Sequence, residues 1–285
     1  MKISELLNQK KPVISFEVFP PKPDYPIETI FRTLDELEKL NPDFISVTYG
    51  AGGGNRERTV EIASKVKHGY QIETLAHLTC VSHSKAEITE IAHSLSEEGI
   101  ENILALRGDY PQGLPQKTGE FSHALDLIDF LRAKGEFSIG AAAYPEGHPE
   151  TAQPEKELVY LKEKVEAGVD FLITQMIFDN NYLYDFSERL SKAGITCPVL
   201  VGVMPIFNVG QIKRISSLCG ATIPRKLSSR LELFADSPED TEKVGIEFAI
   251  NQISDLLANG VHGVHLYTMN KAKQAQRIME SLKLA

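Results

Sequence analysis

Two kinds of segment alternate along this chain, and this alternation constrains the fold more than any other feature. Eight short segments are rich in apolar or β-branched residues and are bounded by turn residues. They span residues 13–19, 44–48, 73–79, 102–106, 138–143, 171–175, 199–203 and 263–267. Near-continuous apolar runs of this length are typical of strands that are buried on both faces, as in parallel sheets.

Amphipathic segments lie between and after these runs. Ile30, Leu34, Leu37 and Leu40, for example, recur at helical spacing. The segments expected to be helices span residues 27–40, 56–67, 85–98, 122–133, 155–167, 182–193, 209–218 and 271–282. Such alternation predicts βαβ units joined by right-handed crossovers.

The strand–helix repeats favour a closed (β/α)8 barrel, the TIM barrel, over an open doubly wound sheet. No Gly-rich dinucleotide fingerprint follows the first strand, and the glycines at 50–54 lack the Gly-Lys-Ser/Thr ending of a phosphate loop. Segments 227–234 and 242–257 predict one or two extra helices before the last strand. We therefore expect an α/β protein with a single barrel domain over residues 1–285, since a barrel takes about 250 residues.

Charge and hydropathy exclude two classes of partner. The formal net charge of -9 argues against nucleic acid, which usually needs a basic surface. The chain has no apolar run of the roughly 18 residues that a membrane span needs, and residues 1–11 lack a signal-peptide core. We therefore expect a cytoplasmic protein.

Polar residues gather where the predicted strands end. In barrels of this kind the active site lies at the C-terminal ends of the strands, so these residues carry information about function. They are Glu17, Thr48, Tyr49, His77, Arg107, Asp109, Tyr144, His148, Gln175, Tyr267 and Asn270. Polar residues at so many strand ends indicate an enzyme active site.

Each of these residues alone has a structural explanation. A lone inward His or Gln can be a hydrogen-bonded core residue, and Arg107 with Asp109 can form a loop ion pair. Glu17 can pair with a Lys or Arg at the barrel rim. Its position beside Phe16, Val18 and Phe19 nevertheless predicts an apolar surrounding that favours the protonated carboxyl, as a general acid requires.

A metal site is a further hypothesis, because Glu17, His77, Asp109 and His148 could converge. These ligand types are scattered, and no His-x-His or His-x-x-x-His pair marks a preformed site. We therefore expect no metal, and chemistry with an organic cofactor instead.

Six motifs in order resemble the methylenetetrahydrofolate reductase family, in its bacterial form with the catalytic domain only. They lie at residues 15–21 (SFEVFPP), 46–51 (SVTYGA), 76–80 (AHLTC), 105–109 (ALRGD), 142–150 (AAYPEGHPE) and 173–175 (ITQ). The resemblance is collinear and runs essentially from end to end.

This resemblance implies a barrel that holds FAD and reduces 5,10-methylenetetrahydrofolate to 5-methyltetrahydrofolate with NAD(P)H, in one-carbon metabolism and methionine supply. Glu17 matches the family's general acid, which assists opening of the methylene bridge to a 5-iminium cation. Asp109 matches the carboxylate between flavin and folate. Gln175 matches a residue that contacts the pterin and the nicotinamide. Lys271 lies at the position that would contact the glutamate tail of folate.

The resemblance also implies a set of cofactor contacts. They fall on Thr48, Tyr49, Ala51, His77, Arg107, Gly108, Asp109, His123, Ala124, Tyr144, His148 and Lys164. Arg107 and Lys164 suit the diphosphate or other acceptor-rich parts of FAD, and Tyr144 offers a flat surface.

Several positions depart from the family pattern. His123 replaces a tyrosine, Tyr160 and Glu163 replace Asn and Arg, Val209 replaces an aromatic residue, and Lys271 replaces an arginine. Two alternatives to the reductase therefore stay open: an FAD-binding barrel subunit of a larger redox complex that takes electrons from a partner protein, and a non-catalytic folate or flavin carrier. We also expect a homo-oligomer.

Overall fold

The computed structural model describes residues 1–49, 56–109, 119–135, 137–151 and 154–284. Its strands form a closed barrel in which each strand pairs in parallel with the next along the chain, and β8 pairs with β1. The strands are β1 (Val13–Val18), β2 (Phe44–Val47), β3 (Glu73–Thr79), β4 (Asn102–Leu106), β5 (Ser138–Ala143), β6 (Phe171–Thr174), β7 (Val199–Val203) and β8 (Gly263–Tyr267). The expected (β/α)8 TIM barrel is confirmed, and each strand agrees with its predicted segment to within a residue.

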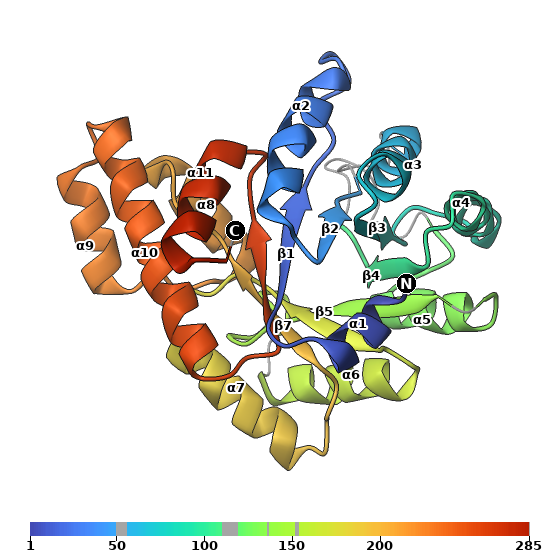
Figure 1. Cartoon of the computed structure of the whole chain (residues 1–285). Helices are drawn as coiled ribbons and strands as arrows, with labels where there is room; N and C mark the ends of the chain where they lie inside the picture. Colours follow the sequence, from blue (N-terminus) through green and yellow to red (C-terminus); the bar gives the residue numbers. More distant parts are fainter. Residues whose placement is uncertain (50–55, 110–118, 136, 152–153, 285) are drawn as a thin grey trace.

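Helices surround the barrel as a ring (Figure 1). They are α2 (Glu28–Leu37) with η1 (Glu38–Leu40), α3 (Arg56–Ser64) with η3 (Lys65–Gly69), α4 (Lys85–Glu97), α5 (Ala124–Arg132), α6 (Pro154–Glu166), α7 (Asn180–Lys192), α8 (Val209–Cys219) and α11 (Ala272–Leu282). Outward-facing strand residues such as Phe16 and Val18 join the same apolar core as Ile30 and Leu34 of α2. In the described part of the chain, no helix has the length and apolar character to cross a membrane.

The extra helices before the last strand are also confirmed, as α9 (Arg225–Leu233) and α10 (Pro238–Ala258). The predicted start of α10 at residue 242 is wrong by four residues. The helix begins at Pro238, and the side chain of Ser237 caps it by accepting a hydrogen bond from the backbone N–H of Asp240. Proline is favourable at a first helical position, so this start is physically reasonable.

One short helix, α1 (Ile3–Gln9), was not predicted. Its buried residues Ile3 and Leu7 pack with inward-facing side chains of the barrel, including Phe44 and Leu75. The backbone N–H of Ile3 donates to Oδ1 of Asn102 at 2.7 Å. Because Asn102 begins β4, α1 closes the N-terminal end of the barrel with apolar side chains.

The barrel interior changes character along its axis. Near the N-terminal ends of the strands it is apolar, with Phe44, Leu75, Phe171 and Leu200 in one cluster. Toward the C-terminal ends the inward positions become polar, beginning with the fully buried His265. The barrel interior is thus apolar at the N-terminal ends of the strands and polar toward their C-terminal ends.

Candidate active site

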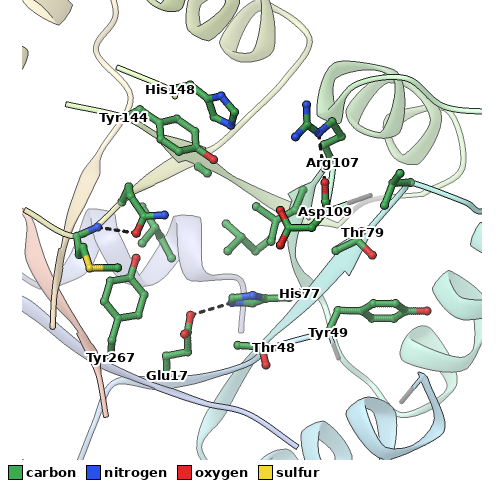
Figure 2. A pocket seen from close by; sticks show the side chains of 18 of the residues that line it. Glu17, Thr48, Tyr49, His77, Thr79, Arg107, Asp109, Tyr144, His148 and Tyr267 are labelled. Atoms are coloured by element: carbon green, nitrogen blue, oxygen red, sulfur yellow. Dashed lines mark hydrogen bonds and ion pairs between the residues drawn. The ribbon is translucent and has the colours of Figure 1, made fainter. Parts of the chain in front are cut away.

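A cavity of about 650 Å³ lies at the C-terminal ends of the strands. Figure 2 shows Glu17 and His77 pointing toward each other, with Tyr267 beside Glu17. Its lining includes Glu17, Thr48, Tyr49, His77, Arg107, Gly108, Asp109, Tyr144, His148, Gln175 and Tyr267. The strand-end residues that the sequence indicated, apart from Asn270, are thus brought together at one end of the barrel.

The surroundings of Glu17 differ from the expectation. Phe16 and Val18 are fully buried in the outer core, and Phe19 is 36% exposed, so none of them encloses the carboxyl. Successive strand side chains point to opposite faces, and Glu17 therefore points into the barrel while its neighbours point outward. The predicted apolar surrounding is wrong; imidazoles flank this carboxyl instead.

Two histidines contact the Glu17 carboxyl. Nε2 of His77 lies 3.6 Å from Oε2 of Glu17, and Nε2 of His265 lies 3.7 Å from the same oxygen. Burial lowers the pKa of His77 to about 4, more than the nearby Glu17 carboxyl raises it. His77 is therefore neutral near pH 7, and Glu17 has no charged imidazole of His77 to pair with.

Tyr267 closes the wall beside Glu17. Its hydroxyl donates to the backbone carbonyl of Thr174 at 2.8 Å. Burial raises its pKa well above the usual value, so the phenol stays protonated and acts as a donor. A Cβ at Gly202 would lie 2.3 Å from the Thr174 carbonyl oxygen and 2.7 Å from the Tyr267 ring, so glycine at this position makes room for the phenol.

Arg107 and Asp109 lie at the opposite wall (Figure 2). Arg107 is held in place by Glu150, which accepts from both guanidinium Nη atoms at 2.5 and 3.0 Å. The guanidinium thus pairs with Glu150 and not with Asp109, the ion pair that the sequence left open as a structural explanation. Gly108 between them has a φ of +85°, and a Cβ there would lie 2.8 Å from Cβ of Thr79. This position requires glycine, and it lets the backbone approach a ligand closely.

A second cavity of about 600 Å³ adjoins the first, sharing Arg107, Tyr144 and His148 with it. It lies between the ends of β4 and β5 and helices α5 and α6, and His123, Ala124 and Lys164 line it. Burial lowers the pKa of Lys164, while the nearby Glu157 raises it. The two cavities together form an extended site. The lining of the second cavity contains both cations and carboxylates, which are Arg107, Lys156, Lys164, Asp126, Glu150, Glu157 and Glu163.

The predicted site residues divide into three groups. All the candidates except three line one of the two cavities. Asn270 lines neither and instead pairs with the backbone of Phe19 at 2.8 and 3.1 Å. Lys271 is exposed, precedes α11 and lines neither cavity. Ala51 lies outside the described residues. Of the departures from the family pattern, Tyr160 and Glu163 line the second cavity.

Sequence reasoning missed other residues of the site. Met176, Met204 and Met269 line the first cavity, and Glu157 is a buried carboxylate in the second. His265 was missed as well, although its spacing two residues before Tyr267 on a predicted strand placed both on the same face. The methionines gave no polar signal, so only the structure could reveal them.

The sequence matches a known family over nearly its whole length. Residues 2–283 match the family described as methylenetetrahydrofolate reductase. The 5,10-methylenetetrahydrofolate reductase of Escherichia coli (strain K12) is 35% identical over 269 residues, covering 94% of this chain and 90% of the bacterial protein. Methylenetetrahydrofolate reductase (NADH) 1 of Arabidopsis thaliana is 38% identical over 297 residues, covering 99% of this chain and 50% of the plant protein. The chain thus spans about half the length of the plant relatives it matches.

A solved structure shares the fold. It is an uncharacterised protein from Clostridium thermocellum, described as binding two copies of 5-methyl-5,6,7,8-tetrahydrofolic acid. Its TM-score is 0.64 at 13% sequence identity, and the match covers 99% of this chain and 98% of that one. At this identity the likeness concerns the barrel fold alone.

Proposed function

Because the chain belongs to the methylenetetrahydrofolate reductase family, we propose that it reduces 5,10-methylenetetrahydrofolate to 5-methyltetrahydrofolate. It does so with bound FAD and with NADH or NADPH as electron donor, as a single catalytic domain over residues 1–285. One observation carries this proposal beyond family membership. Glu17, Asp109 and Gln175 line one cavity, and that cavity continues into a second one whose lining holds Arg107 and Lys164.

The residues present fit FAD. Arg107 and Lys164 supply cations for a diphosphate, and the half-buried ring of Tyr144 lies where the two cavities meet. The positive φ of Gly108 brings its backbone to the cavity wall. His77 Nε2 is a buried atom without a hydrogen-bond partner at the cavity, as expected where a polar ligand group would complete the pairing. When bound, FAD would supply two-electron redox chemistry between nicotinamide and folate.

The chain's own residues would transfer the proton and stabilise the positive charge of the reaction. Opening the methylene bridge to the 5-iminium cation breaks the bond from the methylene carbon to N10, and the electron pair goes to N10. Glu17 then gives its proton to that nitrogen and is left as a carboxylate. The Asp109 carboxylate stabilises the iminium cation electrostatically. Gln175 would orient the pterin through its amide.

An anaerobic two-step assay tests the proposal. Purified protein reconstituted with FAD should lose its yellow absorbance on addition of NADH or NADPH, tested in parallel. It should regain the absorbance when methylenetetrahydrofolate follows. A protein that cannot be loaded with flavin would refute the proposal. A protein that binds FAD but is reduced by neither nicotinamide would point to a partner protein as the electron donor.

The expected homo-oligomer stays a prediction. Light scattering of the purified chain at several concentrations measures the mass directly, and a mass of one chain at every concentration would contradict it.

A further inference from the structure

The guanidinium of Arg107 already binds an anion in this structure, the carboxylate of Glu150. Nη1 of Arg107 donates to Oε2 of Glu150 at 2.5 Å, and Nη2 donates to Oε1 at 3.0 Å. Hydrogen bonding to Arg107 lowers the pKa of Glu150, so this carboxyl is ionised near pH 7. Both residues line the second cavity. The arginine proposed above to bind a diphosphate is therefore engaged with a carboxylate of the same chain.

A carboxylate and a phosphate compete for the same edge of an arginine side chain. Both anions bind a guanidinium through two parallel hydrogen bonds. Glu150 occupies the edge formed by Nη1 and Nη2, while Nε of Arg107 donates to the carbonyl oxygen of Gly108 at 3.2 Å. A diphosphate can therefore make the two-point contact with Nη1 and Nη2 only where Glu150 releases them.

The charges around the second cavity also oppose an anion while Glu150 stays in place. Carboxylates outnumber cations by four to three among the described residues of its lining, which are Asp126, Glu150, Glu157 and Glu163 against Arg107, Lys156 and Lys164. Like charges repel one another, and they do so more strongly when they are partly shielded from water. Movement of the Glu150 carboxylate out of the lining would balance the two signs and would release one cation for the diphosphate.

The Glu150 side chain can leave while its backbone stays in place. The side chain is 61% exposed, so its carboxylate can turn into water at little cost in solvation. The backbone N–H of Glu150 donates to Nδ1 of His148 at 3.1 Å, and the backbone N–H of Thr151 donates to the carbonyl oxygen of His148 at 2.9 Å. The Thr151 hydroxyl donates to Oε2 of Glu157 at 3.0 Å. These bonds fix the chain around Glu150, so rotation of its side chain alone is enough.

We propose that Glu150 is a gate on Arg107: its carboxylate pairs with the guanidinium in the FAD-free protein and turns into solvent when the diphosphate of FAD binds. This inference rests on the proposed function, which supplies the FAD. The gate lowers the affinity for FAD, because the apparent affinity of a ligand is reduced by the fraction of the protein that is competent to bind it.

Isothermal titration calorimetry of the FAD-free protein with FAD tests the gate without any reaction. We expect Glu150→Gln to lower the Kd for FAD about five- to tenfold, because it removes an ion pair that keeps most of the protein in the closed form. The Kd for riboflavin, which has no phosphate, should be equal in wild type and variant. An unchanged Kd for FAD would overturn the gate. A higher Kd would overturn it too, and would show that Glu150 holds Arg107 in position for the cofactor.

Glu247→Gln is the matched control. Glu247 accepts from both Nη atoms of Arg230 at 3.3 and 2.6 Å, which is the same two-point pair, but these two residues lie on α10 and α9 and line neither cavity. The Kd for FAD should therefore stay at the wild-type value. A decrease as large as that in Glu150→Gln would show a general effect of net charge and would contradict the gate.

The Arg107→Gln background separates release of the guanidinium from simple repulsion of the diphosphate. With Arg107 absent there is nothing for Glu150 to release, so adding Glu150→Gln should change the Kd for FAD by less than about twofold. An equal decrease in both backgrounds would show that Glu150 acts only by repelling the cofactor, and the gate would be refuted.

The gate and the proposed function fail in different ways. If wild type and Glu150→Gln bind FAD with the same Kd, the gate is refuted and the reductase stands. If FAD binds as expected but methylenetetrahydrofolate does not reoxidise the reduced flavin, the proposed function is refuted and the gate stands. If neither protein binds FAD, both are refuted.

Discussion

Nε2 of His77 lies 3.6 Å from Oε2 of Glu17, at the point where the barrel interior meets the cavity. Among the side chains that the structure describes, this nitrogen is one of three buried polar atoms without a hydrogen-bond partner. Such an atom costs about 1–3 kcal/mol. A fold that keeps this cost beside an inward-facing carboxyl points to a ligand-binding role for the pair.

Replacing the carboxyl of Glu17 should separate the two half-reactions. In Glu17→Gln we expect folate-dependent oxidation of the flavin to slow by about 10²- to 10⁴-fold, because the proton donor is lost. Flavin binding and its reduction by nicotinamide should be unchanged. Stopped-flow absorbance measures both steps in turn.

A second carboxyl provides the control for this variant. Glu101 is exposed and lies at the opposite end of the barrel, paired with the amino group of Met1 at 3.0 Å. Glu101→Gln should leave both half-reactions at wild-type rates. Near-normal folate turnover by Glu17→Gln would remove Glu17 from the role of acid.

His77 should make the protein less stable in mild acid. Its pKa is lowered from 6.5 to about 4 on folding, so the unfolded chain binds more protons than the folded protein between these values. Stability is therefore full above about pH 6.5 and is lost as the pH falls toward 4. Between pH 7 and pH 5 the loss from this group is about 2 kcal/mol.

Urea unfolding at the two pH values measures this loss. His77→Gln should lose less stability between pH 7 and pH 5 than wild type. His93→Gln should behave as wild type, because His93 is an exposed histidine next to Glu97 on α4. Equal losses in wild type and His77→Gln would contradict the prediction.

Much of the fold could be predicted because its signals are local. Buried parallel strands appear as continuous apolar runs, and Ile30 and Leu34 mark the buried face of α2 by their spacing. The start of α10 depended on recognising Ser237 and Pro238 as a cap and first turn. Helix α1 depended on a tertiary contact, since Ile3 and Leu7 gain their burial only against the closed end of the barrel.

The site could be predicted less completely. Glu17, Asp109 and Gln175 could be predicted as site residues from their positions at the ends of predicted strands, because a barrel brings these ends to one face. The environment of Glu17 could not be inferred from Phe16 and Val18, since sequence neighbours on a strand face opposite sides. His265 contacts Glu17 from a strand about 250 residues away in sequence, and only closure of β8 onto β1 creates that contact.

A methyl group at Gly202 should disrupt the wall beside Glu17. The added Cβ would clash with the Thr174 carbonyl and the Tyr267 ring at once, and the carbonyl is backbone that cannot turn aside. We expect Gly202→Ala to lose about 1–3 kcal/mol or more of stability. Thermal unfolding measures the loss.

Two variants test the cause of that loss. Gly210→Ala is the matched control, because its Cβ would approach only Oδ1 of Asn208, at 3.4 Å. It should be nearly neutral. Tyr267→Phe removes the hydrogen bond to Thr174 and relieves none of the backbone clash, so Gly202→Ala combined with it should remain destabilised. Wild-type stability in Gly202→Ala would show that Thr174 and Tyr267 move to accommodate the added methyl group.

The charge of Asp109 should tune the flavin. Its exposed carboxylate borders the first cavity next to Arg107. Because the Arg107 guanidinium donates its hydrogen bonds to Glu150, the charge of Asp109 is available to a ligand. A nearby negative charge disfavours an anionic reduced flavin. In Asp109→Asn we expect the midpoint potential of bound FAD to rise, on the order of tens of millivolts. The folate step should slow as well, because the cation loses its stabilising partner.

Equilibrium titration against a reference dye measures the potential, and Asp185→Asn on the exposed surface of α7 should leave it unchanged. A potential that stays at the wild-type value in Asp109→Asn would place this carboxylate too far from the flavin to act on it.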